Sequence, residues 1–258
     1  MASDKPPLVL MHGLAMSGRA WQDVVPLLVD FHEVHTPTAL GHRGGPAVQK
    51  RPVRIWDVID AAERYLDNHH LERPHLAGNS MGGMVAIELA RRGRAATVCA
   101  LSPGGFWSAG DGLRATATGN INRGATMVRR THHLARLMMK SATMRRISLQ
   151  SATPHGDRVS TAQAIEMLED TIGCTITAEV QSGDDEQVDP LDPLPCPVTL
   201  AWSGRDTVLP LASYEKVARN RLPQATFTVL PNVGHVPMLD DPGLVARTIL
   251  ETTGATIG

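Results

Sequence analysis

The sequence of 258 residues has little cysteine, few aromatic side chains and no excess of either charge. Its three cysteines, Cys99, Cys174 and Cys196, are odd in number and far apart. That pattern argues against a disulfide framework and for a reducing, cytoplasmic compartment. The 25 basic and 26 acidic residues nearly cancel, so no net field favours nucleic acid or an anionic membrane.

Long hydrophobic runs are also missing. None approaches the length that spans a bilayer, and the N-terminal residues lead into an apolar strand without the pattern of a secretory signal. The histidine pairs His69-His70 and His132-His133 are adjacent in sequence. Adjacent residues do not share a helix face, so we expect no metal site. The expected partner is a small molecule, and the oligomeric state stays open.

Short apolar runs alternate with helical patterns over most of the chain. This alternation is typical of an α/β fold, with a mostly parallel central sheet flanked by helices. The predicted strands span residues 8–11, 33–37, 74–77, 97–101, 198–202 and 226–230, and the predicted helices span 17–28, with Ser17 as its cap, 53–69 and 84–92.

The alternation stops in the middle of the chain. Residues 104–195 lack it and are rich in Met, Arg, Ala and Thr, basic in the first half and acidic in the second. We predict a core domain formed by residues 1–103 and 196–258, and a helical cap or lid inserted as residues 104–195. The two charged halves can pair with each other. Within the cap, the basic amphipathic stretch from Met127 to Ile147 is interpreted as helices packed over the site rather than as a membrane element.

The string Gly78-Asn79-Ser80-Met81-Gly82 has the form G-x-S-x-G between a predicted strand and a predicted helix. In that context it indicates a nucleophile elbow, a sharp turn that exposes the serine hydroxyl. Glycines are needed at positions 78 and 82, because side chains there would collide with the neighbouring strand and helix. Ser80 is therefore the predicted nucleophile.

A second segment lies where the nucleophile needs support. The strand at 8–11 ends in His12, Gly13 and Leu14, where the chain enters a loop that passes close to the serine. Backbone N–H groups at such a place stabilise the negative charge of a tetrahedral intermediate. We predict that the amides of Leu14 and Met81 form this oxyanion hole.

Two more segments supply an acid and a base. Asp206 follows the predicted strand 198–202, and His235 follows the strand 226–230. A serine hydroxyl is a poor nucleophile at neutral pH, so it needs a base such as a neutral imidazole. His235 would take the proton of Ser80, and Asp206 would fix the imidazole tautomer.

These four segments resemble the α/β-hydrolases, in which the triad runs in the order Ser, Asp, His. The resemblance covers both ends of the chain and implies a serine hydrolase with a helical cap and no cofactor. It also implies that His12 supports the oxyanion loop. The loop at 37–45 lacks the acidic residue usual in the family, and His42 in that loop is predicted to be solvated. If Asp206 were not the acid, Asp240 or Asp241 would be the next candidates.

The leading functional hypothesis is hydrolysis of a carboxylic ester, lactone or thioester. Two alternatives stay open. One is carbon–carbon bond hydrolysis of the meta-cleavage-product type, which the strings from Gly78 to Gly83 and from Pro103 to Phe106 resemble, although Val236 stands where that family has Trp. The other is a ligand receptor that keeps the fold and turns over slowly. Relatives with an Asp nucleophile, such as dehalogenases and epoxide hydrolases, are disfavoured because residue 80 is Ser.

Substrate preference is predicted from the cap. Flexible apolar side chains there would adapt to varied aliphatic shapes, which favours short to medium acyl groups. Arg129 or Arg130 would meet a negatively charged leaving portion at the entrance. The side chains expected to line the core or the pocket are Met127, Val128, Leu134, Leu137, Met138, Met144 and Ile147.

Overall fold

The computed structural model describes residues 5–107, 123–180 and 186–255. Within these ranges the strands form a six-stranded sheet in which every neighbouring pair is parallel, in the order β2-β1-β3-β4-β5-β6. The predicted α/β class with a central parallel sheet is confirmed. The strands are β1 (Pro7–Met11), β2 (Glu33–His35), β3 (His75–Asn79), β4 (Thr97–Leu101), β5 (Val198–Ser203) and β6 (Thr226–Leu230).

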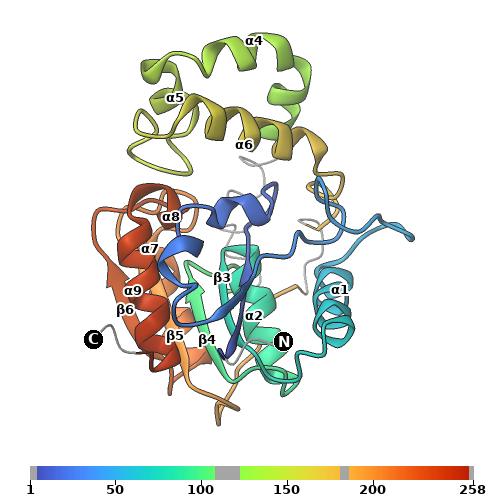
Figure 1. Cartoon of the computed structure of the whole chain (residues 1–258), viewed down its shortest axis with the longest axis vertical. Coiled ribbons are helices and arrows are strands. Elements are labelled where there is room, and N and C mark those ends of the chain that lie inside the picture. The colour runs from blue at the N-terminus through green and yellow to red at the C-terminus, as the bar shows by residue number, and fades with distance from the viewer. Residues whose placement is uncertain (1–4, 108–122, 181–185, 256–258) are drawn as a thin grey trace.

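Helices cover both faces of the sheet (Figure 1). One face packs against α1 (Ile55–Asn68), α2 (Met81–Arg91) and α7 (Leu211–Arg221), and the other against α9 (Pro242–Thr253). Successive side chains of a strand point to opposite faces. Val9 accordingly joins the core beneath α2, whereas Leu8 and Leu10 join the core beneath α9.

The prediction of one helix at residues 17–28 is wrong. The chain instead forms two short 3₁₀ turns, η1 (Gly18–Trp21) and η2 (Val25–Leu27). Pro26 lacks an N–H and cannot donate the bond that a continuous α-helix requires at that position. Ser17 makes no capping bond to η1, and its hydroxyl instead donates to Asp170.

The chain between β4 and β5 forms a helical layer at one end of the molecule. Its described helices include residues 123–130, α4 (His132–Met138), α5 (Ala142–Ser148) and α6 (Thr161–Gly173). Figure 1 shows this layer stacked beyond η1, at the end away from both termini. The limits of the core and the cap stay a prediction. None of the described helices has the length and hydropathy to cross a membrane.

Candidate active site

Ser80 lies on a strained turn between β3 and α2. Its φ of 55° and ψ of −114° place a non-glycine residue at positive φ, which is costly and typical of functional sites. The flanking glycines have no room for side chains. A Cβ at Gly78 would lie 2.2 Å from the Gly82 carbonyl oxygen, and a Cβ at Gly82 would lie 2.2 Å from the Met11 carbonyl oxygen. The local geometry is therefore that of a nucleophile elbow.

His235 is hydrogen bonded to Asp206. The distance from His235 Nδ1 to Asp206 Oδ2 is 2.8 Å, and the Asp206 side chain is fully buried. The other carboxylate oxygen of Asp206 accepts the backbone N–H groups of Val208 at 2.9 Å and Leu209 at 2.7 Å. These bonds fix the orientation of the carboxylate. The carboxylate in turn keeps Nδ1 of His235 as a hydrogen-bond donor, with Nε2 on the side of the ring away from Asp206.

The segment that carries His235 is tied to the elbow by Asn79, the residue before Ser80. The Asn79 side-chain nitrogen donates to the His235 carbonyl at 2.8 Å and to the Leu101 carbonyl at 3.2 Å. The sequence pattern predicts no role for Asn79, because a contact with a residue 156 positions away leaves no signal in it. In the described part of the chain no hydrogen bond joins Ser80 to His235. Such bonds are often long before substrate binds.

The loop after β1 passes beside Ser80. A Cβ at Gly13 would lie 3.5 Å from Ser80 Cβ, within van der Waals contact, so the loop runs directly beside the serine. Within the described ranges, the backbone N–H groups of Leu14 and Met81 have no hydrogen-bond acceptor. Free amides next to the nucleophile are what an oxyanion hole requires.

Two histidines bind this loop to the loop at residues 37–46 in a reciprocal arrangement, which we call the histidine clasp. His12 Nε2 accepts the N–H of Ala39 at 3.0 Å, and His42 Nε2 accepts the N–H of Ala15 at 3.1 Å. A backbone N–H only donates, so both Nε2 atoms are unprotonated. Each Nδ1 lies near a carbonyl oxygen, that of Gly13 for His12 and that of Leu40 for His42.

The histidine clasp shows that the prediction of a solvated His42 is wrong, and it accounts for a lowered pKa of His12. His42 is buried rather than solvated, and its ring meets that of His12 edge to face at 5.0 Å between centroids. Burial lowers the pKa of His12 to about 3, with His42 acting in the same direction and the Gly13 carbonyl opposing. The His12 ring therefore stays neutral near pH 7, and the clasp positions Ala15, the residue after Leu14.

The alternative acids are engaged elsewhere. Asp240 accepts the backbone N–H of Gly234 at 2.8 Å and the hydroxyl of Thr153. Asp241 caps α9 by accepting the N–H of Leu244 at 2.7 Å. Of the three aspartates considered, the one bonded to His235 is Asp206.

An apolar cavity of about 230 Å³ adjoins the elbow. Its wall combines the end of β1, the loop at 37–46, α1 and the first turn of α2, including Met11, Leu40, Val58, Ala62, Met81 and Val85. The side chains predicted to line a pocket are elsewhere. Met127, Leu134, Leu137 and Ile147 are exposed, at 67%, 58%, 61% and 54%. The cavity wall therefore comes from the sheet and its helices, and Arg129 and Arg130 do not border it.

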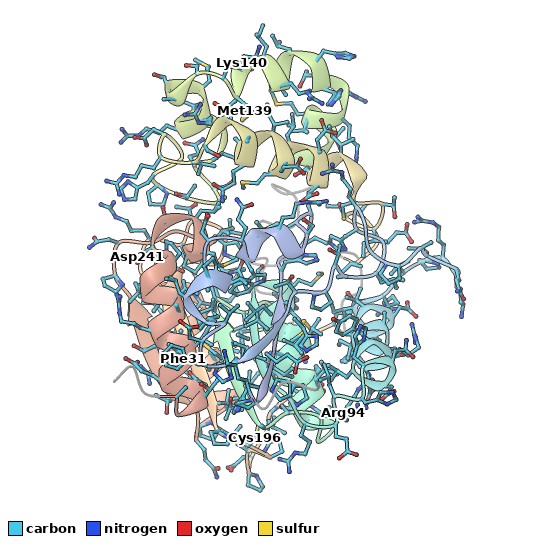
Figure 2. The ribbon with its side chains drawn as sticks, in the orientation of Figure 1. Phe31, Arg94, Met139, Lys140, Cys196 and Asp241 are labelled. Atoms are coloured by element: carbon cyan, nitrogen blue, oxygen red, sulfur yellow. The ribbon has the colours of Figure 1, made fainter. Side chains whose placement is uncertain are left out.

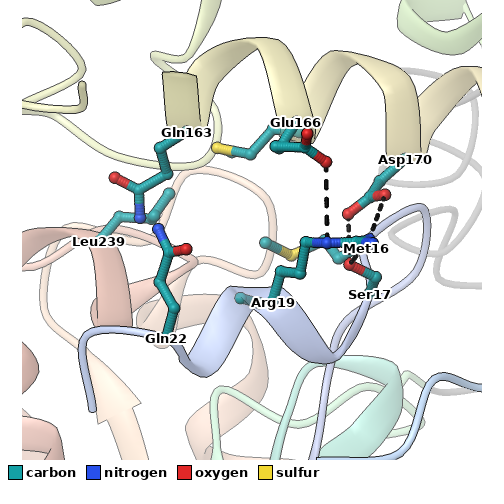
Figure 3. Close-up of a pocket in the computed structure, with 10 residues that line it drawn as sticks. Met16, Ser17, Arg19, Gln22, Gln163, Glu166, Asp170 and Leu239 are labelled. Atoms are coloured by element: carbon teal, nitrogen blue, oxygen red, sulfur yellow. Dashed lines mark hydrogen bonds and ion pairs between the residues drawn. The ribbon is translucent and has the colours of Figure 1, made fainter. Parts of the chain in front are cut away.

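A second hollow lies where α6 meets η1 (Figure 3). It has room for about 20 Å³, too little for a substrate. Figure 3 shows Asp170 and Glu166 of α6 facing Ser17 and Arg19. Arg43 also donates to both carboxylates, at 2.9 Å to Glu166 and 3.0 Å to Asp170. This contact joins the helical layer to the loops beside the site.

No group of three or more His, Cys, Asp or Glu side chains that could hold a metal ion occurs in residues 5–107, 123–180 and 186–255. The three cysteines are buried and unpaired.

The chain matches one family profile and several proteins that are named as hydrolases. The profile described as "Alpha/beta hydrolase family" matches residues 8–248. A protein named epoxide hydrolase EphH from Mycobacterium tuberculosis is 31% identical over 201 residues, 74% of this chain and 91% of that protein. A pimeloyl-[acyl-carrier protein] methyl ester esterase from Aromatoleum aromaticum is 28% identical over 262 residues, 93% of this chain and 94% of that one.

Solved structures agree on the fold. A thermophilic esterase from Thermogutta terrifontis has a TM-score of 0.69 at 22% identity, covering 95% of this chain and 88% of that chain. The 2-hydroxy-6-oxo-6-phenylhexa-2,4-dienoate hydrolase of Rhodococcus sp. strain RHA1 has a TM-score of 0.72 at 19% identity, covering 97% and 91%. At these identities the likeness extends to the fold alone.

Proposed function

The chain belongs to the alpha/beta hydrolase family, and on that premise we propose that it is a serine hydrolase that cleaves a carboxylic ester, lactone or thioester. The observation that carries the proposal is the pairing of a strained Ser80 with the buried Asp206–His235 hydrogen bond at one edge of the sheet. Serine, base and orienting acid are the parts that acyl transfer needs.

In the proposed reaction His235 Nε2 takes the proton of Ser80 as the oxygen attacks the substrate carbonyl carbon. The carbonyl oxygen becomes an oxyanion, which accepts the N–H groups of Leu14 and Met81. His235 then gives its proton to the leaving alcohol. Water, deprotonated by His235, attacks the acyl-enzyme and releases the acid, and the proton returns to Ser80. Asp206 stabilises the imidazolium in both halves.

The relatives differ in the reactions that their names describe. The methyl ester esterase aligns over nearly the whole chain and supports ester cleavage. The protein named an epoxide hydrolase is more similar over a shorter span. Epoxide hydrolases of this fold use an aspartate nucleophile, whereas this chain has Ser80. We therefore keep ester hydrolysis and include an epoxide in the test.

We propose that the acyl group enters the apolar cavity beside Met81. The backbone amide of Met81 is half of the proposed oxyanion hole, and its side chain lines the cavity, so the reacting carbonyl and the cavity share one residue. A cavity of about 230 Å³ suits a short to medium aliphatic chain. Residues 104–195 would serve as the cap above the leaving group.

Carbon–carbon bond hydrolysis is the second candidate. The string from Gly78 to Gly83 resembles that of meta-cleavage-product hydrolases, and solved members share the fold. Val236 follows His235, in place of the Trp of that family. We rank it behind ester hydrolysis for that reason.

The test compares wild type and Ser80→Ala on p-nitrophenyl esters from acetate to decanoate, styrene oxide and a vinylogous diketone acid. We expect ester turnover that rises and then falls with chain length and that Ser80→Ala abolishes. Inert esters with cleavage of the diketone acid would establish the second candidate. Release of one equivalent of p-nitrophenol without further turnover would indicate a ligand receptor that keeps the fold and turns over slowly.

A further inference from the structure

The helical layer carries exposed apolar side chains, and several of its exposed cations have no ion-pair partner among the described residues. Met127, Leu134, Leu137 and Ile147 are more than half exposed. We call these four, together with the exposed Arg130, Lys140 and Arg146, the distal face. Met139, in contrast, is buried and packs toward Ala164 of α6.

The charges of this layer are sorted by side. Residues 123–156 contain seven Lys or Arg and no Asp or Glu. The carboxylates of α6 are engaged in ion pairs: Glu166 and Asp170 with Arg19 and Arg43 of the loops beside the sheet, and Glu169 with His132 and Arg136 of α4. In the described part of the chain no hydrogen bond or ion pair neutralises Arg130, Lys140 or Arg146. The excess of cations in this nearly neutral protein thus lies in the described segment 123–156.

The helical layer that carries the distal face occupies one end of the long axis of the molecule. Figure 1 shows α4 as the outermost element, on the far side of α6 from the sheet. Figure 2 shows Lys140 at this extremity and Met139 beneath it. Neither hollow described above borders the exposed apolar side chains. A projecting end meets a flat surface without interference from the rest of the protein.

We propose that the distal face binds the surface of an anionic lipid bilayer. Large apolar side chains next to Lys and Arg match the interface, where the apolar groups reach the acyl boundary and the cations meet lipid headgroups. A second copy of the chain fits poorly, because a symmetric contact would place two cationic faces together. Nucleic acid would use the cations but leave the apolar side chains exposed to water. This inference does not depend on the proposed ester hydrolysis.

Binding is tested by co-sedimentation of the full chain with vesicles of phosphatidylcholine alone and of phosphatidylcholine mixed with phosphatidylglycerol. We expect binding only to the anionic vesicles, and weaker binding as added salt shortens the Debye length. Absence of binding to anionic vesicles at low salt overturns the proposal.

Two variants separate the contributions of charge and of apolar contact to vesicle binding. Arg130→Gln with Lys140→Gln and Arg146→Gln should weaken binding about 10- to 100-fold, since each cation near an anionic surface contributes about a tenfold factor or less. A second variant, with Leu134→Ser and Leu137→Ser, keeps the charge and should weaken binding about tenfold through lost apolar contact. All five sites are exposed, so unchanged thermal melting confirms that each variant folds.

The matched controls carry the same substitutions elsewhere. One replaces the exposed Lys50, Lys216 and Arg247 by Gln, and the other replaces the exposed Leu27 and Val29 by Ser. We expect both controls to bind like wild type. Equal losses in controls and distal-face variants would show nonspecific attraction and overturn the proposal. So would a wild-type dimer that the distal-face variants dissociate, or tighter binding to DNA or an acidic protein than to vesicles.

Discussion

Ser80 lies at a strained backbone position, and the proposed reaction requires two residues that follow more than 120 positions later. The positive φ of Ser80 and the close contacts at Gly78 and Gly82 restrict the backbone conformation of the turn. Ser80→Ala should keep the fold and reduce ester turnover about 10⁴- to 10⁶-fold. His235→Ala should cost a similar amount, and the double variant should be scarcely slower than either single one. Steady-state kinetics checks this, and losses that multiply would refute a joint role.

Asp206 is expected to act through His235. Asp206→Asn keeps the shape of the side chain, but its amide can hold the imidazole in the wrong tautomer. The expected loss in kcat is about 10³- to 10⁴-fold, with little change in thermal melting. Asp241→Asn, which changes the cap of α9, is the matched control and should retain activity. Near-normal turnover of Asp206→Asn would assign the acid elsewhere.

The histidine clasp predicts a pH dependence of stability. His12 has a lowered pKa when folded, so below its unfolded pKa of about 6.5 the unfolded chain binds a proton that the folded chain does not. The contribution of His12 to stability is complete above that pH and declines as pH falls toward 3. His12→Gln, whose amide oxygen extends as far as Nε2 and can still accept the Ala39 N–H, should flatten the pH dependence of the unfolding free energy between pH 6.5 and 4. An unchanged slope would show that His12 does not titrate in this way.

The sequence predicts local features of the site, such as the glycines of the turn at Ser80, but it does not predict contacts between distant segments. The need for Gly78 and Gly82 follows from the turn itself, and the structure confirms both. The burial of His42 depends on Ala15, 27 residues away, and the bond from Asn79 to His235 spans 156. No short pattern encodes such distances.

At the scale of elements, the contact between α6 and η1 joins the helical layer to the loops at the site. Asp170 is buried and faces two arginines, whereas the neighbouring Glu166 is partly exposed. Asp170→Asn should lower the free energy of unfolding by about 1–3 kcal/mol, reduced from the fully buried case because the arginines reach solvent. Glu166→Gln is the matched control and should cost less than about 1 kcal/mol. Equal costs in chemical denaturation would contradict the burial argument.

The cavity predicts a change in substrate preference. Ala62 of α1 lines it, so Ala62→Phe should fill part of the volume. We expect acetate esters to be cleaved at the wild-type rate and the longest acyl chains to lose activity, because each methylene excluded from the cavity forfeits up to about 0.8 kcal/mol. Ala212→Phe on the exposed surface of α7 is the control. An unchanged chain-length profile would place the acyl group outside the cavity.

Elements with strong periodicity were predicted well. The stripe from Ile55 to Leu66 gives α1, and each predicted strand has a counterpart in the sheet. The sequence predicts that Leu134 and Leu137 line the core or the pocket, whereas both are exposed, because hydrophobicity alone does not reveal which face of a helix meets the protein. Periodicity shows that a face exists, and packing decides what covers it.

For the whole molecule, strand order determines where the site lies. The chain runs from β1 outward to β2 and then returns to β3 on the other side of β1. Ligands of such sheets bind at the carboxyl ends of the strands, where this order reverses. The loop after β1 and the elbow after β3 meet at that point, and the segments after β5 and β6 bring Asp206 and His235 to the same edge.

Covalent labelling tests whether Ser80 is an activated nucleophile. The protein is incubated with an alkyl fluorophosphonate, and intact mass is followed by peptide mapping. Attack by the serine oxygen on phosphorus expels fluoride, so we expect one phosphonyl group per chain, on Ser80, with none on Ser80→Ala and slow labelling of His235→Ala. Labelling of another residue, or none in wild type under conditions that label a known serine hydrolase, would contradict it.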